Sequence, residues 1–159
     1  MGYLSRIVVS CICIIFVVTG CGTRLERYSH TPSETDGELY IYRAYDLLKS
    51  GVIAVLFVND APIANLNTNE YVHIPVNSSE YSIAVNAQTY TGENVLMKLS
   101  IAAGETKYIE ILVDQTQYAW SFAGIWANDT NPFYLKNADK ESFFMKKDKL
   151  EHQDILSVQ

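Results

Sequence analysis

Cysteine is scarce in this sequence, and what little there is lies near the N-terminus. The 159 residues include three cysteines, Cys11, Cys13 and Cys21, and none follows them. A chain that loses its first twenty residues therefore has no internal disulfide, although small exported domains commonly depend on disulfides. What remains is still long enough to fold as one domain around a hydrophobic core.

Motifs for the common chemistries are also missing. Glycines are few, and neither G-x-G-x-x-G nor G-x-x-x-x-G-K-[ST] occurs, so no loop is suited to cradling phosphates. A G-x-S-x-G nucleophile motif is absent as well. Acidic residues lie mostly in predicted turns, where carboxylates ordinarily solvate loops. The net charge of −6 leaves no basic stripe for nucleic acid. We expect a protein that is not an enzyme and that binds no cofactor and no nucleic acid.

The three histidines, His30, His73 and His152, lie in three separate segments. A helical zinc site of the H-E-x-x-H type needs two histidines one turn apart. We therefore expect no metal site. His73 lies in an alternating segment, where we expect a partly exposed side chain.

A long hydrophobic run is missing too. Residues 7–18 are uncharged, but a membrane span needs about 17–25 apolar residues. Arg6 precedes the run, and the sequence Val-Thr-Gly-Cys at residues 18–21 follows it. A basic start, a short apolar stretch and small residues before a cleavage point indicate a secretory signal peptide. The alternatives are a permanent span, a secreted protein cut after Gly20 without lipidation, and a buried helix, which the β-branched composition disfavours.

The Val-Thr-Gly-Cys ending resembles the lipobox of bacterial lipoproteins. The resemblance implies that residues 1–20 are a removed signal peptide and that Cys21 becomes an acylated N-terminus, for which palmitate is the typical chain. Two or more acyl chains anchor a protein stably. Gly22, rather than aspartate, follows the cysteine, which by this family's sorting rule implies the outer membrane, facing the periplasm. Residues 21–37 are polar without apolar periodicity, so we expect a lipidated tether.

From residue 38 onward the pattern is that of β-strands. Apolar and polar residues alternate with a period of two, and turn-forming residues separate the segments. Seven short strands at this spacing predict an all-β fold, an antiparallel β-sandwich over residues 38–135. The predicted strands are 38–42, 52–58, 63–66, 71–76, 81–87, 95–101 and 106–113.

Within these strands we assign one face to the core. The residues expected to face it are Val55, Phe57, Ile83, Val85, Leu99, Ile109 and Ile111. Residues 136–159 are rich in charge, and their pattern is split between helix and strand. We describe them as a charged C-terminal tail that is helical in one of the two interpretations.

Three segments resemble a known family. They are F-V-N-D-A-P-I-A-N-L at 57–66, Y-S-I-A-V at 81–85 and L-S-I-A-A-G-E-T-K-Y-I-E-I at 99–111. They are similar to DUF2846, a domain of unknown function in small Gram-negative lipoproteins, over residues 38–113. The resemblance implies an immunoglobulin-like or transthyretin-like β-sandwich in the periplasm. Such domains usually have a Pro-Gly turn before the fifth strand, where this chain has Ser-Ser-Glu at 78–80. No activity is established for the family, so the resemblance assigns no catalytic residue.

One aromatic cluster is a candidate binding site. Trp120, Phe122 and Trp126 alternate within an extended segment, and Trp and Tyr are frequent anchors in both protein interfaces and sugar sites. The alternative is that these rings cover an open face of the sandwich. The sequence thus predicts an envelope lipoprotein that binds another protein, or else a carbohydrate-binding or peptidoglycan-binding module.

Overall fold

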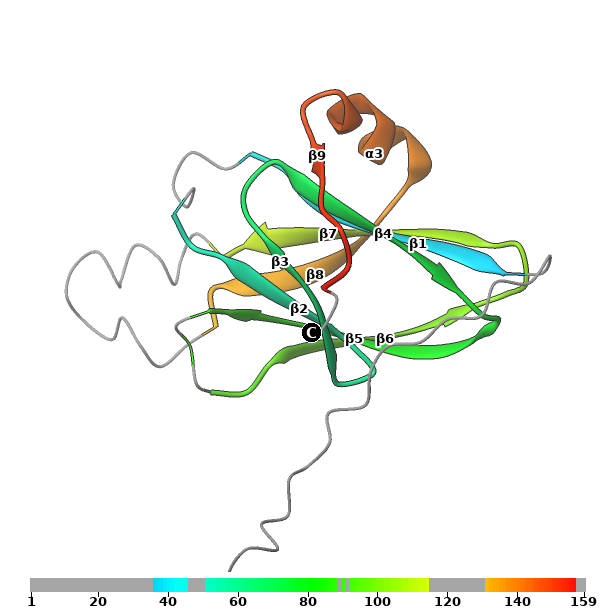
Figure 1. Cartoon of the computed structure of the whole chain (residues 1–159), viewed down its shortest axis with the longest axis horizontal. Helices are drawn as coiled ribbons and strands as arrows, with labels where there is room; N and C mark the ends of the chain where they lie inside the picture. The colour runs from blue at the N-terminus through cyan, green and yellow to red at the C-terminus, as the bar shows by residue number, and fades with distance from the viewer. Residues whose placement is uncertain (1–35, 46–50, 89, 91, 115–130, 157–159) are drawn as a thin grey trace, which may run out of the picture.

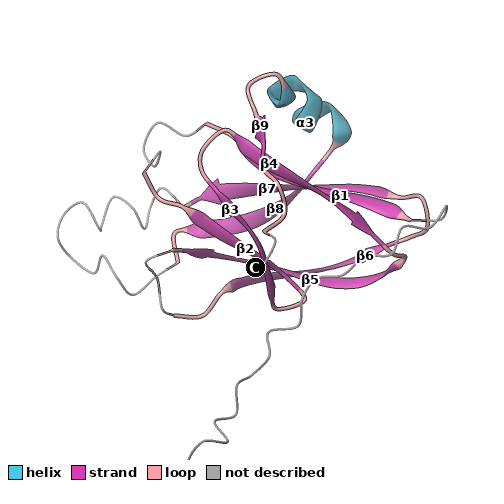
Figure 2. Ribbon diagram, in the orientation of Figure 1, coloured by secondary structure: helices cyan, strands magenta, loops and turns pink. Residues whose placement is uncertain are grey.

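The computed structural model describes residues 36–45, 51–88, 90, 92–114 and 131–156, which form two β-sheets packed face to face (Figure 1, Figure 2). Sheet A has the strand order β8-β7-β1-β4-β9, and sheet B has the order β3-β2-β5-β6. The predicted all-β sandwich is confirmed. The strands are β1 (Gly37–Arg43), β2 (Ala54–Val58), β3 (Ala61–Leu66), β4 (Glu70–Val76), β5 (Ser79–Ala87), β6 (Val95–Ile101), β7 (Thr106–Val113), β8 (Phe133–Ala138) and β9 (Glu151–His152).

Turn chemistry explains where several of these strands end. Asn59 and Asp60 connect β2 to β3, and both have positive φ angles, 49° and 63°. Asn and Asp tolerate this left-handed region, and two such residues in succession characterise the tight turns of β-hairpins. Gly104, with φ of 71°, supplies a left-handed residue in the turn that leads from β6 of sheet B to β7 of sheet A. Both turns lie where the sequence predicts them.

Sheet A is mixed rather than wholly antiparallel. β1 lies in its middle and pairs antiparallel with β4 but parallel with β7, with Ile41 opposite Ile109. The prediction of an antiparallel sandwich is wrong for this pair and for the short β4–β9 pair, which is also parallel. Alternation of apolar and polar residues has the same period in both pairings, so the sequence pattern alone does not distinguish them.

The core fills the space between the sheets. Ile83, Val85, Ile109 and Ile111 are buried there as predicted, and Leu99 packs against the core while half-buried. The prediction for β2 is wrong: its fully buried residues are Ala54, Leu56 and Val58, whereas Val55 and Phe57 are only partly buried on the opposite face. Every residue of 52–58 is apolar, so the strand has no polar position to show which face is turned outward.

The C-terminal residues pack onto the sandwich. The predicted boundary at residue 135 falls inside β8, and the helix α3 (Lys140–Lys147) follows. Asp139 caps this helix, because its carboxylate accepts a hydrogen bond of 2.7 Å from the Ser142 backbone N–H. The helical and the strand interpretation of residues 136–159 are therefore each correct for part of the segment, because the end of β8, the helix α3 and the strand β9 follow one another.

After β9 the chain crosses from sheet A to sheet B, as Figure 1 shows in front of the sandwich. The Gln153 N–H donates to the Tyr71 carbonyl at 2.8 Å, and the Leu156 N–H donates to the Ile63 carbonyl at 2.7 Å. Ile155 packs against the core between them. The part of the chain that the structure describes holds no helix with the length and apolar composition of a membrane span.

Candidate interaction surface

The outer face of sheet A is covered by α3. Phe143, fully buried, lies 5.2–5.7 Å in ring-centroid distance from four tyrosines of the sheet, Tyr40, Tyr42, Tyr71 and Tyr108. Contacts of this length are favourable aromatic pairs. Phe143 therefore anchors α3, and this face is a small second core.

Polar groups at the edge of this small core are matched to one another. Lys146 of α3 donates to Glu110 of β7 at 2.5 Å, and its ammonium also lies 5.5 Å from the centre of the Tyr42 ring. Burial raises the pKa of Tyr42, and the nearby Glu110 carboxylate raises it further. The tyrosine thus stays neutral, and the ion pair fixes the position of the helix.

A ladder of stacked rings continues along the same face. His73 stacks on Tyr40 with centroids 4.4 Å apart, and Tyr40 stacks on Tyr108 at 5.4 Å. His73 also lies 3.7 Å from the Glu38 carboxylate. His73 is partly exposed, as the sequence predicts. Over the described residues, no group of three or more potential ligands is placed to hold a metal ion.

A buried arginine connects the end of β1 to the start of β2 and the end of β3. Arg43, at the end of β1, donates from Nη1 to the carbonyl oxygens of Val52 and Leu66, and its guanidinium lies 4.9 Å from the centre of the Phe133 ring. Hydrogen bonds and a stacked ring are what a buried guanidinium requires. We interpret Arg43 as a structural residue of the sandwich.

The outer face of sheet B differs from that of sheet A, because an apolar row crosses all four of its strands. Pro62 of β3 pairs with Phe57 of β2, Phe57 pairs with Ala84 of β5, and Ala84 pairs with Leu96 of β6. Residues directly opposite in antiparallel strands point to the same face. We call this row the apolar stripe. Leu96 is 53% exposed, and Phe57 and Pro62 are partly exposed.

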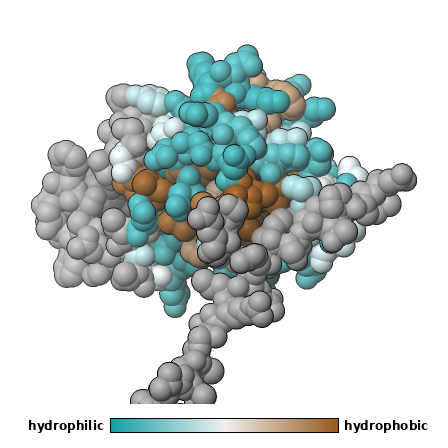
Figure 3. Space-filling view, viewed as in Figure 1, coloured by the Kyte–Doolittle hydropathy of each residue, from teal (hydrophilic) through white to brown (hydrophobic). Residues whose placement is uncertain are grey.

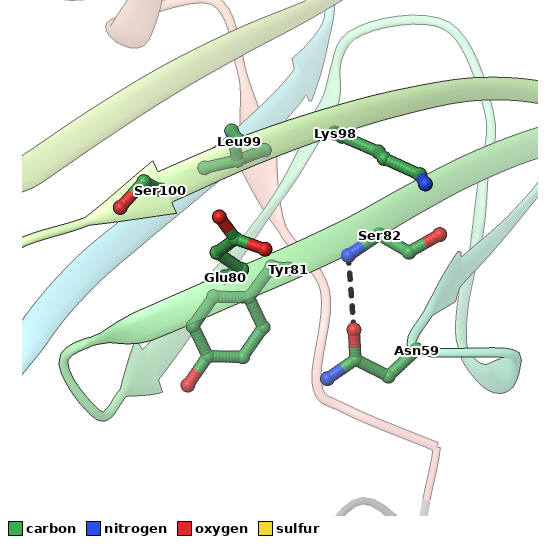
Figure 4. A pocket seen from close by; sticks show the side chains of 7 residues that line it. All are labelled: Asn59, Glu80, Tyr81, Ser82, Lys98, Leu99 and Ser100. Atoms are coloured by element: carbon green, nitrogen blue, oxygen red, sulfur yellow. Dashed lines mark hydrogen bonds between the residues drawn. The ribbon is translucent and has the colours of Figure 1, made fainter.

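A polar groove adjoins the apolar stripe on one side. Figure 4 shows the residues that line this groove. It has a volume of about 360 Å³ and includes Asn59, Glu80, Ser82, Lys98 and Ser100. The Ser82 N–H donates to the Asn59 side-chain oxygen at 2.9 Å, and the Asn59 N–H donates to the Ser82 carbonyl at 2.8 Å. The hairpin turn is thereby fixed against β5. On the other side of the stripe, Asn65 and Asn86 flank Val55. The stripe therefore has a polar rim.

A second, wider hollow lies where β6 meets the ends of β7 and β8, and its two carboxylates, Glu105 and Asp139, already have partners. Lys107 lies 2.5 Å from Glu105, and the Ala102 N–H and Lys107 together lower the pKa of Glu105. Asp139 caps α3, and the Ser142 N–H lowers its pKa. Groups committed in this way are not poised as general acids or bases.

The seam between the sheets is the remaining apolar region in view. Figure 3 shows apolar side chains gathered in the middle of the view, where the sheets meet, with mostly hydrophilic side chains around α3 above them. The segment 153–156 crosses this seam and bonds to both sheets. The seam is thus occupied by the chain itself. Among the described residues, the outer face of sheet B is the surface on which an apolar row crosses a whole sheet, and we take it as the candidate interaction surface.

The site residues predicted from the sequence, Cys21, Trp120, Phe122 and Trp126, all fall outside the described residues. Sequence reasoning missed the apolar stripe because Phe57 was assigned to the core. A signal was present, however. In residues 52–58 the odd-numbered and the even-numbered positions are both apolar, which is typical of strands covered on both faces.

Comparisons of this chain with protein-family models, with curated proteins and with solved structures find no match.

Proposed function

We propose that this chain is an envelope lipoprotein, anchored in the outer membrane through Cys21, whose non-catalytic β-sandwich binds another protein in the periplasm. The apolar stripe of sheet B carries the protein-binding part of this proposal. The order of residues 6–21, a basic residue, an apolar stretch and Val-Thr-Gly-Cys, supports the anchor. The similarity to the DUF2846 lipoproteins remains a prediction from the sequence.

The difference between the two outer faces supports a binding role. On sheet A, Phe143 covers the tyrosines, and a matched ion pair closes the edge. On sheet B, the stripe leaves Leu96 and Phe57 accessible to solvent. Protein interfaces combine an apolar centre with a polar rim, and this face has both. This difference between the faces is what supports a partner at sheet B.

Mass spectrometry of the membrane fraction tests the anchor. Trypsin should release a first peptide that spans residues 21–24 and carries acyl chains on Cys21. A peptide that retains residues 1–20, or an unmodified Cys21, would contradict the anchor and leave the binding proposal to be tested by itself.

Photo-crosslinking in intact membranes tests binding. A photoreactive residue in place of Leu96 should give a discrete adduct containing another protein chain. The control carries the same residue in place of Tyr134, which is 43% exposed on a strand of sheet A. Equal adducts at both positions, or none at either, would contradict the assignment to sheet B.

Two further variants address the tryptophans. If Trp120 and Trp126 are anchors, Trp120→Ala with Trp126→Ala should remove a protein adduct while circular dichroism stays unchanged. A shift of tryptophan fluorescence on titration with cell-wall sugars, without any protein adduct, would instead favour the carbohydrate-binding alternative.

A further inference from the structure

We propose that the partner at sheet B is a second copy of this chain, packed sheet on sheet about a twofold axis that runs parallel to β2 and β5. The inference rests on the proposed function, because it names the partner of that surface. The axis lies between β2 and β5, the two inner strands of the sheet order β3-β2-β5-β6. Such packing repeats the aligned arrangement of sheets in a sandwich.

One pair of the stripe, Phe57 and Ala84, is complementary in size under this symmetry, and Ala84 is 4% exposed between its two larger neighbours in the row. The axis exchanges β2 with β5 and β3 with β6, so Phe57 of one copy lies over Ala84 of the other. In the same way Pro62 lies over Leu96. These residues occupy one row of the register. A large ring over a small methyl group, repeated twice by symmetry, is the interdigitation that close packing requires.

The charges of the face are complementary under the same axis. Lys98 lies two residues beyond Leu96 on β6, and Asp60 lies two residues before Pro62 at the β2–β3 turn. Both residues are exposed. The exchange of β3 and β6 brings Lys98 of each copy over Asp60 of the other. Opposite charges at matching positions fix the register of an interface.

Edge-to-edge pairing of two copies is less favourable. β6 and β8 are outer strands of their sheets, and each carries a lysine, Lys98 and Lys136. A lysine in an edge strand opposes the addition of another strand. On β3, the Ile63 carbonyl already accepts a hydrogen bond from Leu156. We therefore place the contact on the outer face of sheet B rather than on these three edges.

The area is small, which fits an association that depends on the membrane. Four strands at about 4.8 Å spacing and five residues at about 3.4 Å rise give on the order of 300 Å² of projected face per copy. Stable interfaces bury about 800 Å² per partner. Tethering both copies to one membrane raises their effective concentration and offsets the difference. The lipid anchor would thus decide where the dimer forms.

Chemical crosslinking of the full-length protein in its membrane tests this register. Two packed sheets lie about 10 Å apart, which exceeds the reach of a disulfide, so a bis-maleimide of matching length is used. Pro62→Cys with one tag and Leu96→Cys with another are produced together. We expect a crosslinked band of twice the chain mass that carries both tags, and much weaker bands from either variant alone.

Matched controls accompany this pair. Tyr134→Cys with Met145→Cys, two exposed positions on the side of sheet A, should give no such band. The unmodified chain should not react, because its mature form has no thiol besides the acylated Cys21. Lys98→Asp should lower the yield roughly two- to thirtyfold, as expected for the loss of two symmetry-related exposed ion pairs, and Asp60→Lys added to it should restore the yield.

Each outcome separates the two proposals. A band with both tags supports the second copy. An adduct of Leu96→Cys with a different protein overturns the second copy and leaves the proposed function standing. No adduct with any protein overturns both, and equal yields from the Pro62–Leu96 pair and from the controls overturn the assigned face.

Discussion

Phe143 provides a direct test of how the second core is built. Its ring is fully buried among four tyrosines of sheet A. Phe143→Ala should therefore lower the free energy of unfolding by about 3–5 kcal/mol, as for other buried phenylalanines. The helix that carries the ring has eight residues, which is too short to persist without its packing.

Urea unfolding followed by near-ultraviolet circular dichroism measures this loss, because the tyrosines that surround Phe143 contribute to the signal. Phe144→Ala is the matched control, since Phe144 lies on the same helix but is 46% exposed. We expect it to cost about 1 kcal/mol or less. Equal losses from the two variants would refute the reasoning, because they would show that burial of Phe143 does not hold α3 in place.

Three further predictions concern the sandwich itself. Gly37→Ala should lower the melting temperature, because an added Cβ would lie 2.8 Å from a backbone carbonyl oxygen, whereas Gly51→Ala, with nothing within 4 Å, should not. Leu56→Ala should cost about 2–5 kcal/mol in urea unfolding and Val55→Ala distinctly less, and the reverse order would return β2 to the predicted face. The pKa of Asp139 is lowered in the folded state, because its carboxylate accepts a hydrogen bond from a backbone N–H of the first helical turn. Its contribution to the free energy of unfolding is therefore present above the unfolded-state pKa and is lost as the pH falls through the folded-state pKa. Asp139→Asn keeps the helix cap but removes the titrating group, so the urea midpoint should depend less on pH in the acidic range. An unchanged pH dependence would contradict this assignment.

The contrast between the two outer faces predicts that substitutions on the two sides of β2 have different effects. The tyrosines on the outer face of sheet A are covered by α3, which lies between β8 and β9 in the chain, and the rings of this face are already in contact with one another. Sheet B presents Phe57 and Leu96 in one row beside a polar groove. A substitution that removes Phe57 should therefore affect association more than folding, whereas one that removes Leu56 should do the opposite.

Local patterns predicted most of the strands. Alternation in residues 71–76 and 106–113, and turn residues such as Asn59 and Gly104, depend on neighbours in sequence alone. The helix α3 was open to two interpretations because its one buried residue is Phe143. A single contact leaves no periodicity to detect, although the Asp139 cap was a local signal.

The sequence by itself determined the strands β1 to β7, the turns at Asn59 and Gly104 and most of the predicted core residues, because these follow from the period of the side chains and from the φ preferences of a few residues. Only the tertiary structure decided which face of β2 turns inward, since the residues on both faces of 52–58 are apolar. It also decided that β1 lies between β4 and β7 and that Phe143 covers the tyrosines of sheet A. Such pairings join residues far apart in the chain, and their choice depends on how all the apolar faces are covered together rather than on any segment alone.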